Sequence, residues 1–410
     1  MNGAREQTRR ICVIGLRGLP GVIGGVETLC EHVYPRIAAA SPSTEITLLI
    51  RRGYAERGRF RYRYRGVDVR ALRAPLIWGV DTLIHTFWAL VYARAALAPD
   101  LVHLHGIGPG FFAPLARLLG FATIVTHHAP DYERPKWGKR GRLFLKAGER
   151  FTARWANAVV CVSEALSARF LALHPGARKR TRVIRNAGVL EGAGRPNASD
   201  VLEELGVMPG GYVLAVGRLE ATKAFDDLIT AFGQARPAGL KLVIAGSDAG
   251  NIEYAQALLS RASPHVIFAG FRAGDALRQL YESAALFVHP SYMEGYGLVV
   301  GEALSAGLPL LVSDIPPHRE FGLDERCYFP PGDTDALTSA LAGLDYDRYR
   351  SSKASARQRA DSWDRVAREH LALYAELAPL GTGDAPGVEP GTPDLPPGPE
   401  VVCLNPANQT

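Results

Sequence analysis

Residues 212–228 read YVLAVGRLEATKAFDDL: an apolar run, a loop with two cations, and the start of a helical pattern. The apolar run is continuous rather than alternating, which is typical of a strand covered on both faces of its sheet. Similar runs, separated by helical patterns, recur at 11–16, 45–50, 101–106, 122–128, 158–163, 241–246, 266–270, 286–290 and 309–313. Strands that alternate with helices indicate parallel α/β units. We therefore predict an α/β fold of two tandem, doubly wound, Rossmann-like domains.

The chain of 410 residues is longer than one ordinary domain, and its composition changes mark the divisions. We expect a first domain over 1–190 and a second over 191–360, which opens with a Gly- and Pro-containing connection at 191–200. Apolar residues at helical spacing predict a terminal helix over 361–378. The last segment, 379–410, is rich in proline and glycine, and we expect it to be disordered.

Composition is that of a soluble globular protein, with 47% apolar and 21% charged residues. No run approaches the ~20 apolar residues that span a bilayer, so we expect no integral membrane segment. Five scattered cysteines favour buried thiols in a reducing cytosol, without disulfides or structural zinc. Residues 1–190 hold 30 basic and 12 acidic residues, whereas the remainder has a net charge of −12. The first domain should therefore favour an anionic partner.

Ligands of open α/β sheets bind at the carboxyl ends of the strands, so the loops there are candidates for the site. After run 11–16, Gly24 and Gly25 precede a helical pattern, which suits either a phosphate site or a simple turn. After run 122–128, polar side chains crowd one strand end: His127, His128, Asp131, Glu133, Arg134 and Lys136. Metal-ligand spacing is not evident there, so we favour hydrogen bonding to a polyhydroxylated substrate.

Two further loops carry charge. Arg218 and Lys223 follow run 212–217 and could converge on a polyphosphate, or could be ordinary surface cations. Residues 291–304, SYMEGYGLVVGEAL, place Glu294 in a loop and Glu302 about one turn inside a helix that begins near Leu298. Helix rise puts the two carboxylates about 10 Å apart, more than the ~5 Å of a retaining glycosidase pair. We therefore expect two separate contacts on one extended ligand, unless Glu302 is a surface residue.

These motifs, in this order, resemble the retaining glycosyltransferase family 4, whose members have the two-domain GT-B fold and use nucleotide-sugar donors. The resemblance covers about residues 10–375. It rests on GGVET at 24–28, on GRL at 217–219 separated by three residues from Lys223, and on the Glu-(x)7-Glu segment within 289–309.

Carried over position by position, the resemblance implies that Arg218 and Lys223 hold the donor diphosphate. It implies that Glu302 binds the nucleotide ribose and that Glu294 and His128 lie by the transferred sugar. The implied catalytic set is His128, Arg218, Lys223 and Glu294, and the implied donor-binding set is Gly24, Gly25, Gly270, Phe271, Gly295, Tyr296, Gly297, Leu298 and Glu302. Ala129 and Ala224 stand where the family usually has glycine, from which we expect altered loop shape rather than lost activity.

The resemblance also implies transfer with retention of anomeric configuration. Our hypothesis is that the leaving diphosphate takes the acceptor proton, and we expect no metal and no other cofactor. Residues 125–138, with GLRGLP at 15–20, resemble a bacterial branch that acts in exopolysaccharide, capsule or O-antigen assembly. That likeness implies hexosyl transfer from a UDP- or GDP-type donor to a lipid-linked oligosaccharide.

Cations mix with aromatic residues at 59–65 and 134–146. Such mixtures suit an anionic membrane surface, at ~1 kcal/mol per cation; a solvated face and nucleic acid are the alternatives. We favour the membrane, expect no nucleic acid, and predict a cytoplasmic protein peripheral to the inner face of the cytoplasmic membrane. The rival function is a catalytically silent GT-B subunit that binds a nucleotide sugar or a partner glycosyltransferase.

Overall fold

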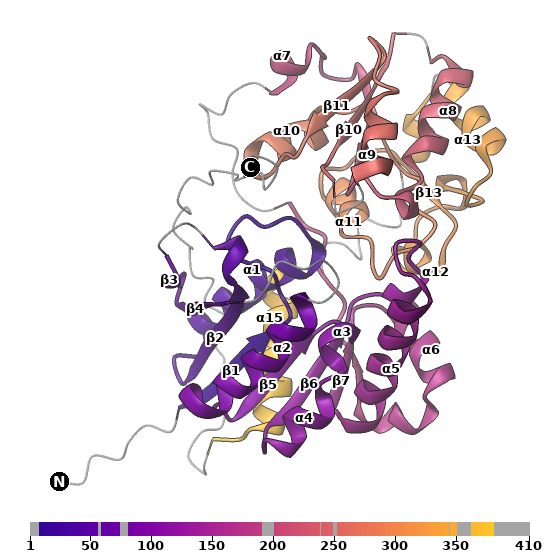
Figure 1. The fold of residues 1–410 in the computed structure, drawn as a ribbon. Helices are drawn as coiled ribbons and strands as arrows, with labels where there is room; N and C mark the ends of the chain where they lie inside the picture. The colour runs from indigo at the N-terminus through magenta and orange to yellow at the C-terminus, as the bar shows by residue number, and fades with distance from the viewer. Residues whose placement is uncertain are drawn as a thin grey trace.

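The computed structural model describes residues 8–55, 59–73, 81–190, 201–237, 239–248, 252–343, 345–350 and 362–380. The predicted connection at 191–200 and the predicted disorder beyond 380 lie outside these residues. Two sheets form two domains stacked end to end (Figure 1). The α/β fold class with two doubly wound domains is thus confirmed.

The first sheet has eight strands in the order β3-β4-β2-β1-β5-β6-β7-β8, all parallel except the edge strand β3. Its strands are β1 (Arg9–Ile14), β2 (Thr44–Arg51), β3 (Arg61–Tyr64), β4 (Val67–Leu72), β5 (Leu101–His105), β6 (Ala122–His127), β7 (Ala158–Cys161) and β8 (Thr181–Val183). The chain order reverses between β1 and β5, which is the switch point where such sheets bind ligands.

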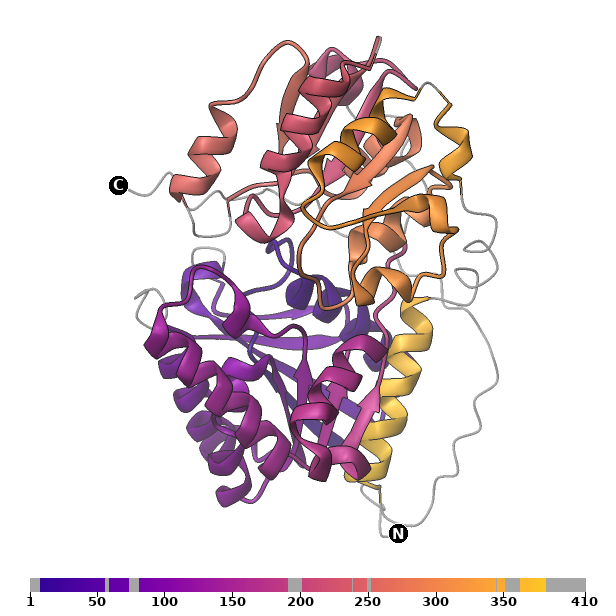
Figure 2. The same cartoon turned by 90° about the vertical axis from the view of Figure 1, so that its right-hand side faces the viewer.

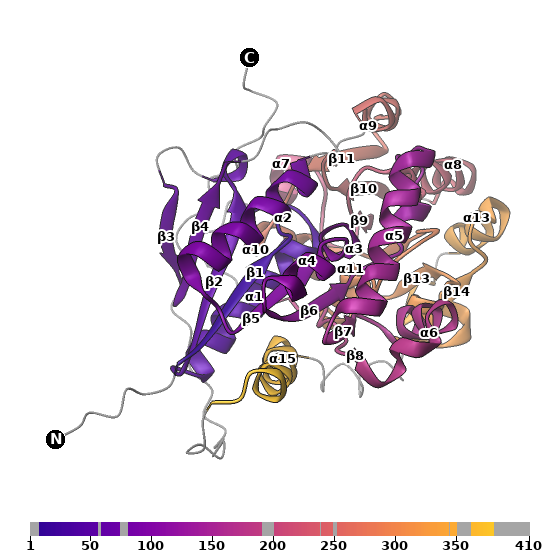
Figure 3. The same cartoon turned by 60° about the horizontal axis from the view of Figure 1, so that its bottom comes forward.

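Helices cover both faces of this sheet (Figure 3). The helices are α1 (Gly25–Ala40), α2 (Asp81–Tyr92), α3 (Ile107–Gly110), α4 (Ala113–Leu118), α5 (Lys139–Trp155) and α6 (Glu164–Leu173). Short turns of other helix types are η1 (Arg52–Tyr54), η2 (Ala93–Leu97), η3 (Asp131–Glu133) and η4 (Pro175–Arg180). Leu29 and Val33 of α1 pack on one face, whereas Leu90 of α2 and Phe170 of α6 pack on the other.

The second sheet has six parallel strands in the order β11-β10-β9-β12-β13-β14, with its switch point between β9 and β12. They are β9 (Tyr212–Val216), β10 (Lys241–Ala245), β11 (Val266–Gly270), β12 (Leu286–His289), β13 (Leu310–Ser313) and β14 (Tyr328–Phe329). The helices are α7 (Val201–Leu205), α8 (Phe225–Ala235), α9 (Ile252–Leu259), α10 (Gly274–Ser283), α11 (Leu298–Ser305), α12 (Pro316–Arg319) and α13 (Thr334–Ala342). The turns are η5 (Ala221–Lys223), η6 (Glu325–Cys327) and η7 (Asp347–Tyr349).

The last helix, α15 (Trp363–Leu377), lies against the first domain beside α1 (Figure 2). Trp363, Val366 and Tyr374 are buried in the core of that domain. The Trp363 ring stacks on His32 at 4.7 Å. The chain therefore leaves the first domain, builds the second, and returns.

Each of the ten apolar runs overlaps a strand, and the Arg-Tyr alternation at 59–65 contains the edge strand β3. β4, β8 and β14 were missed, because β4 alternates apolar with polar residues and the other two are only 3 and 2 residues long. Cys12, Cys30, Cys161 and Cys327 are buried free thiols. Within the described residues, no helix combines the length and apolarity needed to cross a bilayer.

Candidate active site

Loops from the two domains meet where the carboxyl ends of the sheets face each other. Gly295, after β12, lies so close to the first domain that a Cβ there would be 1.7 Å from the carbonyl oxygen of His128. Elsewhere along this boundary between the domains, which we call the cleft, a Cβ on Gly25 would be 3.9 Å from the side chain of Leu298. Two pairs of predicted site residues are therefore brought together across the domain boundary.

Lys223 and Glu294 form the centre of the second domain's side of the cleft. Lys223 ends η5, just after β9, and its ammonium group donates to the Glu294 carboxylate. The same oxygen, Oε1, lies 2.7 Å from Nε2 of His289 on β12. Burial alone would raise the pKa of Glu294, but Lys223 and His289 outweigh it and hold that pKa well below the usual range. Glu294 is therefore a charged, preorganised hydrogen-bond acceptor.

The same cluster is the one candidate for metal binding in the part of the chain that the structure describes. Ligand atoms of His289, Glu294 and His318 lie within 4.8 Å of one another. Nδ1 of His318 already lies 2.8 Å from the Ser313 carbonyl oxygen. A divalent ion would have to displace the Lys223 ammonium from Glu294, so these residues fit a lysine-paired carboxylate better than a metal centre.

A second charged network crosses the cleft. The Glu220 carboxylate accepts from Arg218 Nη2 at 3.0 Å, from Thr222 Oγ1 at 3.0 Å, and from Arg134 Nη1 of the first domain at 2.8 Å. Arg134 also pairs with Asp131 at 2.8 Å. Burial and the nearby Arg134 lower the pKa of Arg218. Arg218 thus lies close to other cations, including Arg134, and clustered positive charge of this kind is expected at an anion-binding site.

Arg134 and Lys136 correct our interpretation of 134–146 as one membrane-facing stretch. The Arg134 side chain is 15% exposed and turns into the cleft to reach Glu220. Burial, followed by the charges of Arg134 and Arg218, lowers the pKa of Lys136, so this lysine also belongs to the cleft. The physical reason is that Glu220, a carboxylate of the other domain, accepts directly from Arg134, so this side chain turns away from solvent.

The glycine-rich turn after β1 is held by an ion pair that we did not predict. Glu27, in the first turn of α1, is buried and accepts from the backbone nitrogen and Nε of Arg17, both at 3.0 Å. A Cβ on Gly24 would lie 2.1 Å from Glu27 Oε2, so the turn needs glycine there. The sequence did offer a signal for this ion pair: Glu27 follows Gly24 and Gly25 closely and lies in a helical turn among apolar residues.

Glu302 has a partner of its own. The Tyr281 hydroxyl donates to Glu302 Oε2 at 2.8 Å, and burial raises the pKa of Glu302, with Tyr281 opposing. The two glutamates thus have separate partners, as expected of two contacts rather than an acid–base pair. Gly297, with φ of 96°, precedes α11, whereas the Tyr296 ring is buried against Phe321 and only its backbone is available to a ligand.

Among the predicted donor-binding residues, Gly270 ends β11 with φ of 68°. Two residues on, Arg272 is bound to Glu204 of α7 by its Nη1 at 2.9 Å. Phe271 is partly exposed between them. His128 lies in the loop after β6, where its Nε2 is 3.0 Å from Nδ1 of His105. Burial lowers the pKa of His128 to about 4, so it is neutral at physiological pH.

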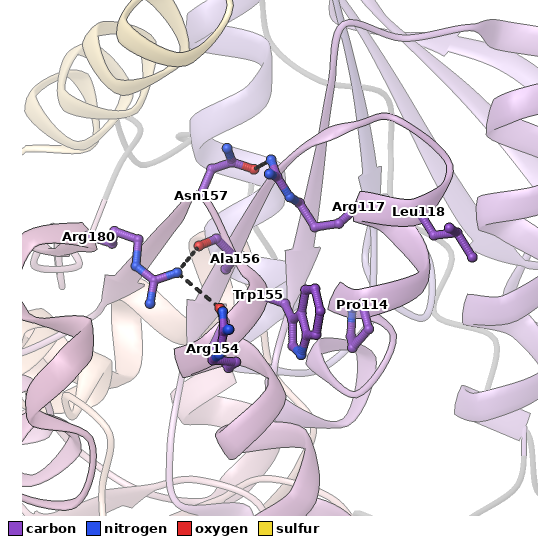
Figure 4. A pocket seen from close by; sticks show the side chains of 8 residues that line it. All are labelled: Pro114, Arg117, Leu118, Arg154, Trp155, Ala156, Asn157 and Arg180. Carbon is purple, nitrogen blue, oxygen red and sulfur yellow. Dashed lines mark hydrogen bonds between the residues drawn. The ribbon is translucent and has the colours of Figure 1, made fainter.

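A pocket of about 710 Å³ lies elsewhere, at the ends of α4 and α5 in the first domain (Figure 4). Its arginines have structural partners: Arg180 donates to the carbonyl oxygens of Ala153, Arg154 and Ala156, and Arg117 donates to Asn157 at 2.7 Å. The residues that line it are Pro114, Arg117, Leu118, Arg154, Trp155, Ala156, Asn157 and Arg180. None of them is a predicted site residue, so we place the site in the cleft.

Two sequence families match the chain, one for each domain. "Glycosyltransferase Family 4" matches residues 23–188, and "Glycosyl transferases group 1" matches residues 210–345. The GDP-mannose-dependent alpha-mannosyltransferase of Mycobacterium tuberculosis is 29% identical over 332 residues, covering 75% of this chain and 82% of that protein. O-antigen chain mannosyltransferase B of Escherichia coli is 23% identical over 66% of this chain and 74% of that protein.

Solved structures share the fold. Sucrose-phosphate synthase from Thermosynechococcus elongatus superposes with a TM-score of 0.76 at 22% identity, covering 90% of this chain and 99% of that chain. Anabaena HepE in complex with UDP and glucose superposes with a TM-score of 0.70 at 18% identity, covering 90% and 100%.

Proposed function

Because this chain belongs to glycosyltransferase family 4 and has the GT-B fold, we propose that it transfers a hexosyl group from a nucleotide sugar with retention of anomeric configuration. The general activity, glycosyl transfer from a nucleotide-sugar donor, follows from the family. The retaining course, the role of each residue and the acceptor are our proposals.

The observation that carries the proposal is the pairing of Lys223 with Glu294 beside Arg218, at the switch point of the second sheet. As the glycosidic bond breaks, negative charge grows on the departing diphosphate. Arg218 and Lys223 neutralise that charge, and preorganised groups of this kind commonly contribute ~3 kcal/mol each. Glu294 then accepts hydrogen bonds from sugar hydroxyls, and Glu302 from the ribose.

No covalent intermediate is needed in this scheme. Glu294 is already held by Lys223 and His289, so it is a poor candidate for a nucleophile. We propose that the acceptor oxygen attacks the anomeric carbon on the face that the diphosphate leaves, and that its proton passes to a diphosphate oxygen. The charge that a metal would supply comes from Arg218 and Lys223, with Arg134 of the first domain close by.

For the acceptor, we propose a lipid-linked oligosaccharide of cell-surface polysaccharide assembly. Support comes from the motif at 125–138 and from the likeness to the E. coli O-antigen mannosyltransferase. The mycobacterial relative, named for GDP-mannose, and HepE, solved with UDP, support a GDP- or UDP-type donor.

A lipid-linked acceptor requires contact with the membrane, and α5 offers a suitable surface. Its exposed side is basic, with Lys139, Arg142, Lys146 and Arg150, and it includes Leu143 at 71% exposure. Trp88, 54% exposed, lies on α2, on the same side of the first sheet (Figure 3). We propose that this surface docks on anionic lipid at the inner face of the cytoplasmic membrane. Sedimentation with anionic vesicles should fall in Leu143→Asp at moderate salt; binding as strong as that of the unaltered protein would contradict the assignment.

The function is tested by thermal-shift screening of the full chain against nucleoside diphosphates and nucleotide sugars, followed by turnover assays with the donor found. A donor well above its dissociation constant should raise stability by a few kcal/mol. Lys223→Ala should lower turnover by about a hundredfold, whereas Lys179→Ala, an exposed lysine outside the cleft, should not. Wild-type turnover in Lys223→Ala would refute the assignment. Donor binding without turnover on any lipid-linked acceptor would favour the catalytically silent subunit.

A further inference from the structure

His128 is the outer end of a series of buried, hydrogen-bonded side chains. Its Nε2 is 3.0 Å from Nδ1 of His105 on β5, and Nε2 of His105 bonds to the hydroxyl of Tyr34 on α1. The Tyr34 hydroxyl is also 3.1 Å from Nδ1 of His103. The same nitrogen of His103 is 2.7 Å from the hydroxyl of Tyr374 on α15. The series therefore runs from the cleft to the last helix of the chain.

The members of this series are packed too tightly to reorient freely. His105 is 1% exposed, and His103, Tyr34 and Tyr374 are each fully buried. The rings of His103 and His105 stack at 4.4 Å, and those of His105 and His128 stack at 5.2 Å. Burial lowers the pKa of His105 well below its usual value and that of His128 to about 4. Each ring therefore carries one proton at neutral pH, so each has one donor and one acceptor nitrogen.

We take Nδ1 of His103 as its acceptor nitrogen, and this choice sets the direction of the bonds at the inner end. His103 Nε2 lies 2.7 Å from the Thr126 hydroxyl, and its Nδ1 lies near two tyrosine hydroxyls. One lone pair accepts one good hydrogen bond. The shorter contact, from Tyr374 at 2.7 Å, should carry it, which leaves the Tyr34 proton for its own shorter contact, with His105.

From Tyr34 outward the assignment follows from that choice. If His105 Nε2 accepts from Tyr34, then His105 Nδ1 is the protonated nitrogen and donates to His128 Nε2. His128 Nε2 is then an acceptor, and its proton is on Nδ1. The opposite direction would require His103 to carry its proton on Nδ1 and donate to Tyr374, with its Nε2 accepting from Thr126.

We propose that His105, oriented by Tyr34, is a positioning residue that holds His128 in the Nδ1-H tautomer, so that this histidine offers the substrate an N-H donor. In the cleft, the acceptor of that donor would be a hydroxyl or ring oxygen of the transferred sugar. This ligand rests on the proposed function, whereas the tautomer does not. His128 so held cannot act as a general base through Nδ1, which agrees with a proton that leaves on the diphosphate.

The tautomer can be measured directly on the full chain with ¹⁵N-labelled histidine. NMR distinguishes protonated from unprotonated ring nitrogens, and the His128 signals are identified by their loss in His128→Asn. At neutral pH we expect Nδ1 of His128 to be protonated and Nε2 to be an acceptor. Protonated Nε2 in the unaltered protein would overturn the proposal, and this result needs no substrate.

Two matched tyrosine variants test how the tautomer is held. Tyr34→Phe removes the hydroxyl that bonds to His105, whereas Tyr374→Phe removes an equally buried hydroxyl that bonds to His103 and not to His105. We expect a mixture of His128 tautomers and about a tenfold lower kcat/KM in Tyr34→Phe, the size of one hydrogen bond. Tyr374→Phe keeps the bond from Tyr34 to His105, so it should shift the His128 tautomer less than Tyr34→Phe does. His105→Asn, which keeps an N-H toward His128, should retain the proton on Nδ1 of His128.

An unchanged His128 spectrum in Tyr34→Phe would overturn the role of the tyrosine. If the tautomer is as predicted but no glycosyl transfer is found, that result would contradict only the proposed function.

Discussion

Gly295→Ala tests whether the contact between the two domains is the working arrangement of the site. The added Cβ would lie 1.7 Å from the carbonyl oxygen of His128, where ordinary contacts begin at 3.4 Å. Both groups belong to backbone, so no side chain can move aside, and the loops must separate by more than about 1 Å. A displacement of this size between reacting groups can cost about 100-fold in rate. We therefore expect kcat/KM to fall by about two orders of magnitude.

Donor binding supplies the internal control, because the second domain carries Arg218, Lys223 and Glu302 whether or not the cleft closes. The affinity of Gly295→Ala for the nucleoside diphosphate, measured by titration calorimetry, should fall far less than kcat/KM does. Small-angle scattering should show a more open shape. Gly233→Ala, a helical glycine whose Cβ would meet nothing within 4 Å, is the matched variant and should keep full activity. Full activity in Gly295→Ala would refute the reasoning, because it would mean that the closed contact plays no part in turnover.

Ala224 has φ of 51° and ψ of 38°, the left-handed region that favours glycine, so Ala224→Gly should stabilise the protein by about 0.5 to 1 kcal/mol; a lower melting temperature would contradict this. Arg134→Leu removes the bond to Glu220 across the cleft, and we expect about a tenfold loss of kcat/KM, whereas unchanged kinetics together with an unchanged scattering profile would argue against a role in closure. Burial raises the pKa of Glu302, with Tyr281 opposing, so the free protein loses stability as the pH rises through that pKa. Nucleoside diphosphate affinity should increase over the same interval, because ribose hydroxyls donate to the ionised form, and a slope that persists in Glu302→Gln would count against this assignment.

Local pattern was sufficient for much of the fold. Continuous apolar runs predicted ten strands, because a strand that is buried on both faces has mostly apolar residues at every position. The strand β4 was missed for the converse reason: it lies next to the edge strand β3, and its sequence alternates apolar and polar residues. The short strands β8 and β14, of 3 and 2 residues, have too few positions to show any period.

Site residues were predictable where they immediately follow a strand, as Arg218 and Lys223 do. Residues that depend on distant partners were not. The basic stretch around Arg134 gave no sign of which cation turns inward, because that is decided by Glu220, 86 positions later. In the same way, Tyr34 and His105 are 71 positions apart, and nothing local marks them as neighbours. Charge pairing across the cleft depends on the assembled fold. A single sequence therefore shows the charged residues but not which of them pair with each other.

The return of α15 to the first domain has a consequence for how the protein is made. Trp363 and Tyr374 complete the core of the first domain, yet they leave the ribosome only after the entire second domain has been synthesised. The domain that emerges first is therefore the last to be finished, and until then the α1 surface that α15 covers stays exposed. Because the Tyr374 hydroxyl also bonds to His103, the same late event connects the carboxyl end of the chain to the histidines that lead to the cleft. A chain that lacks α15 would in this way lack both a sealed core and a complete series of hydrogen bonds behind His128, so maturation of the site would follow the synthesis of α15.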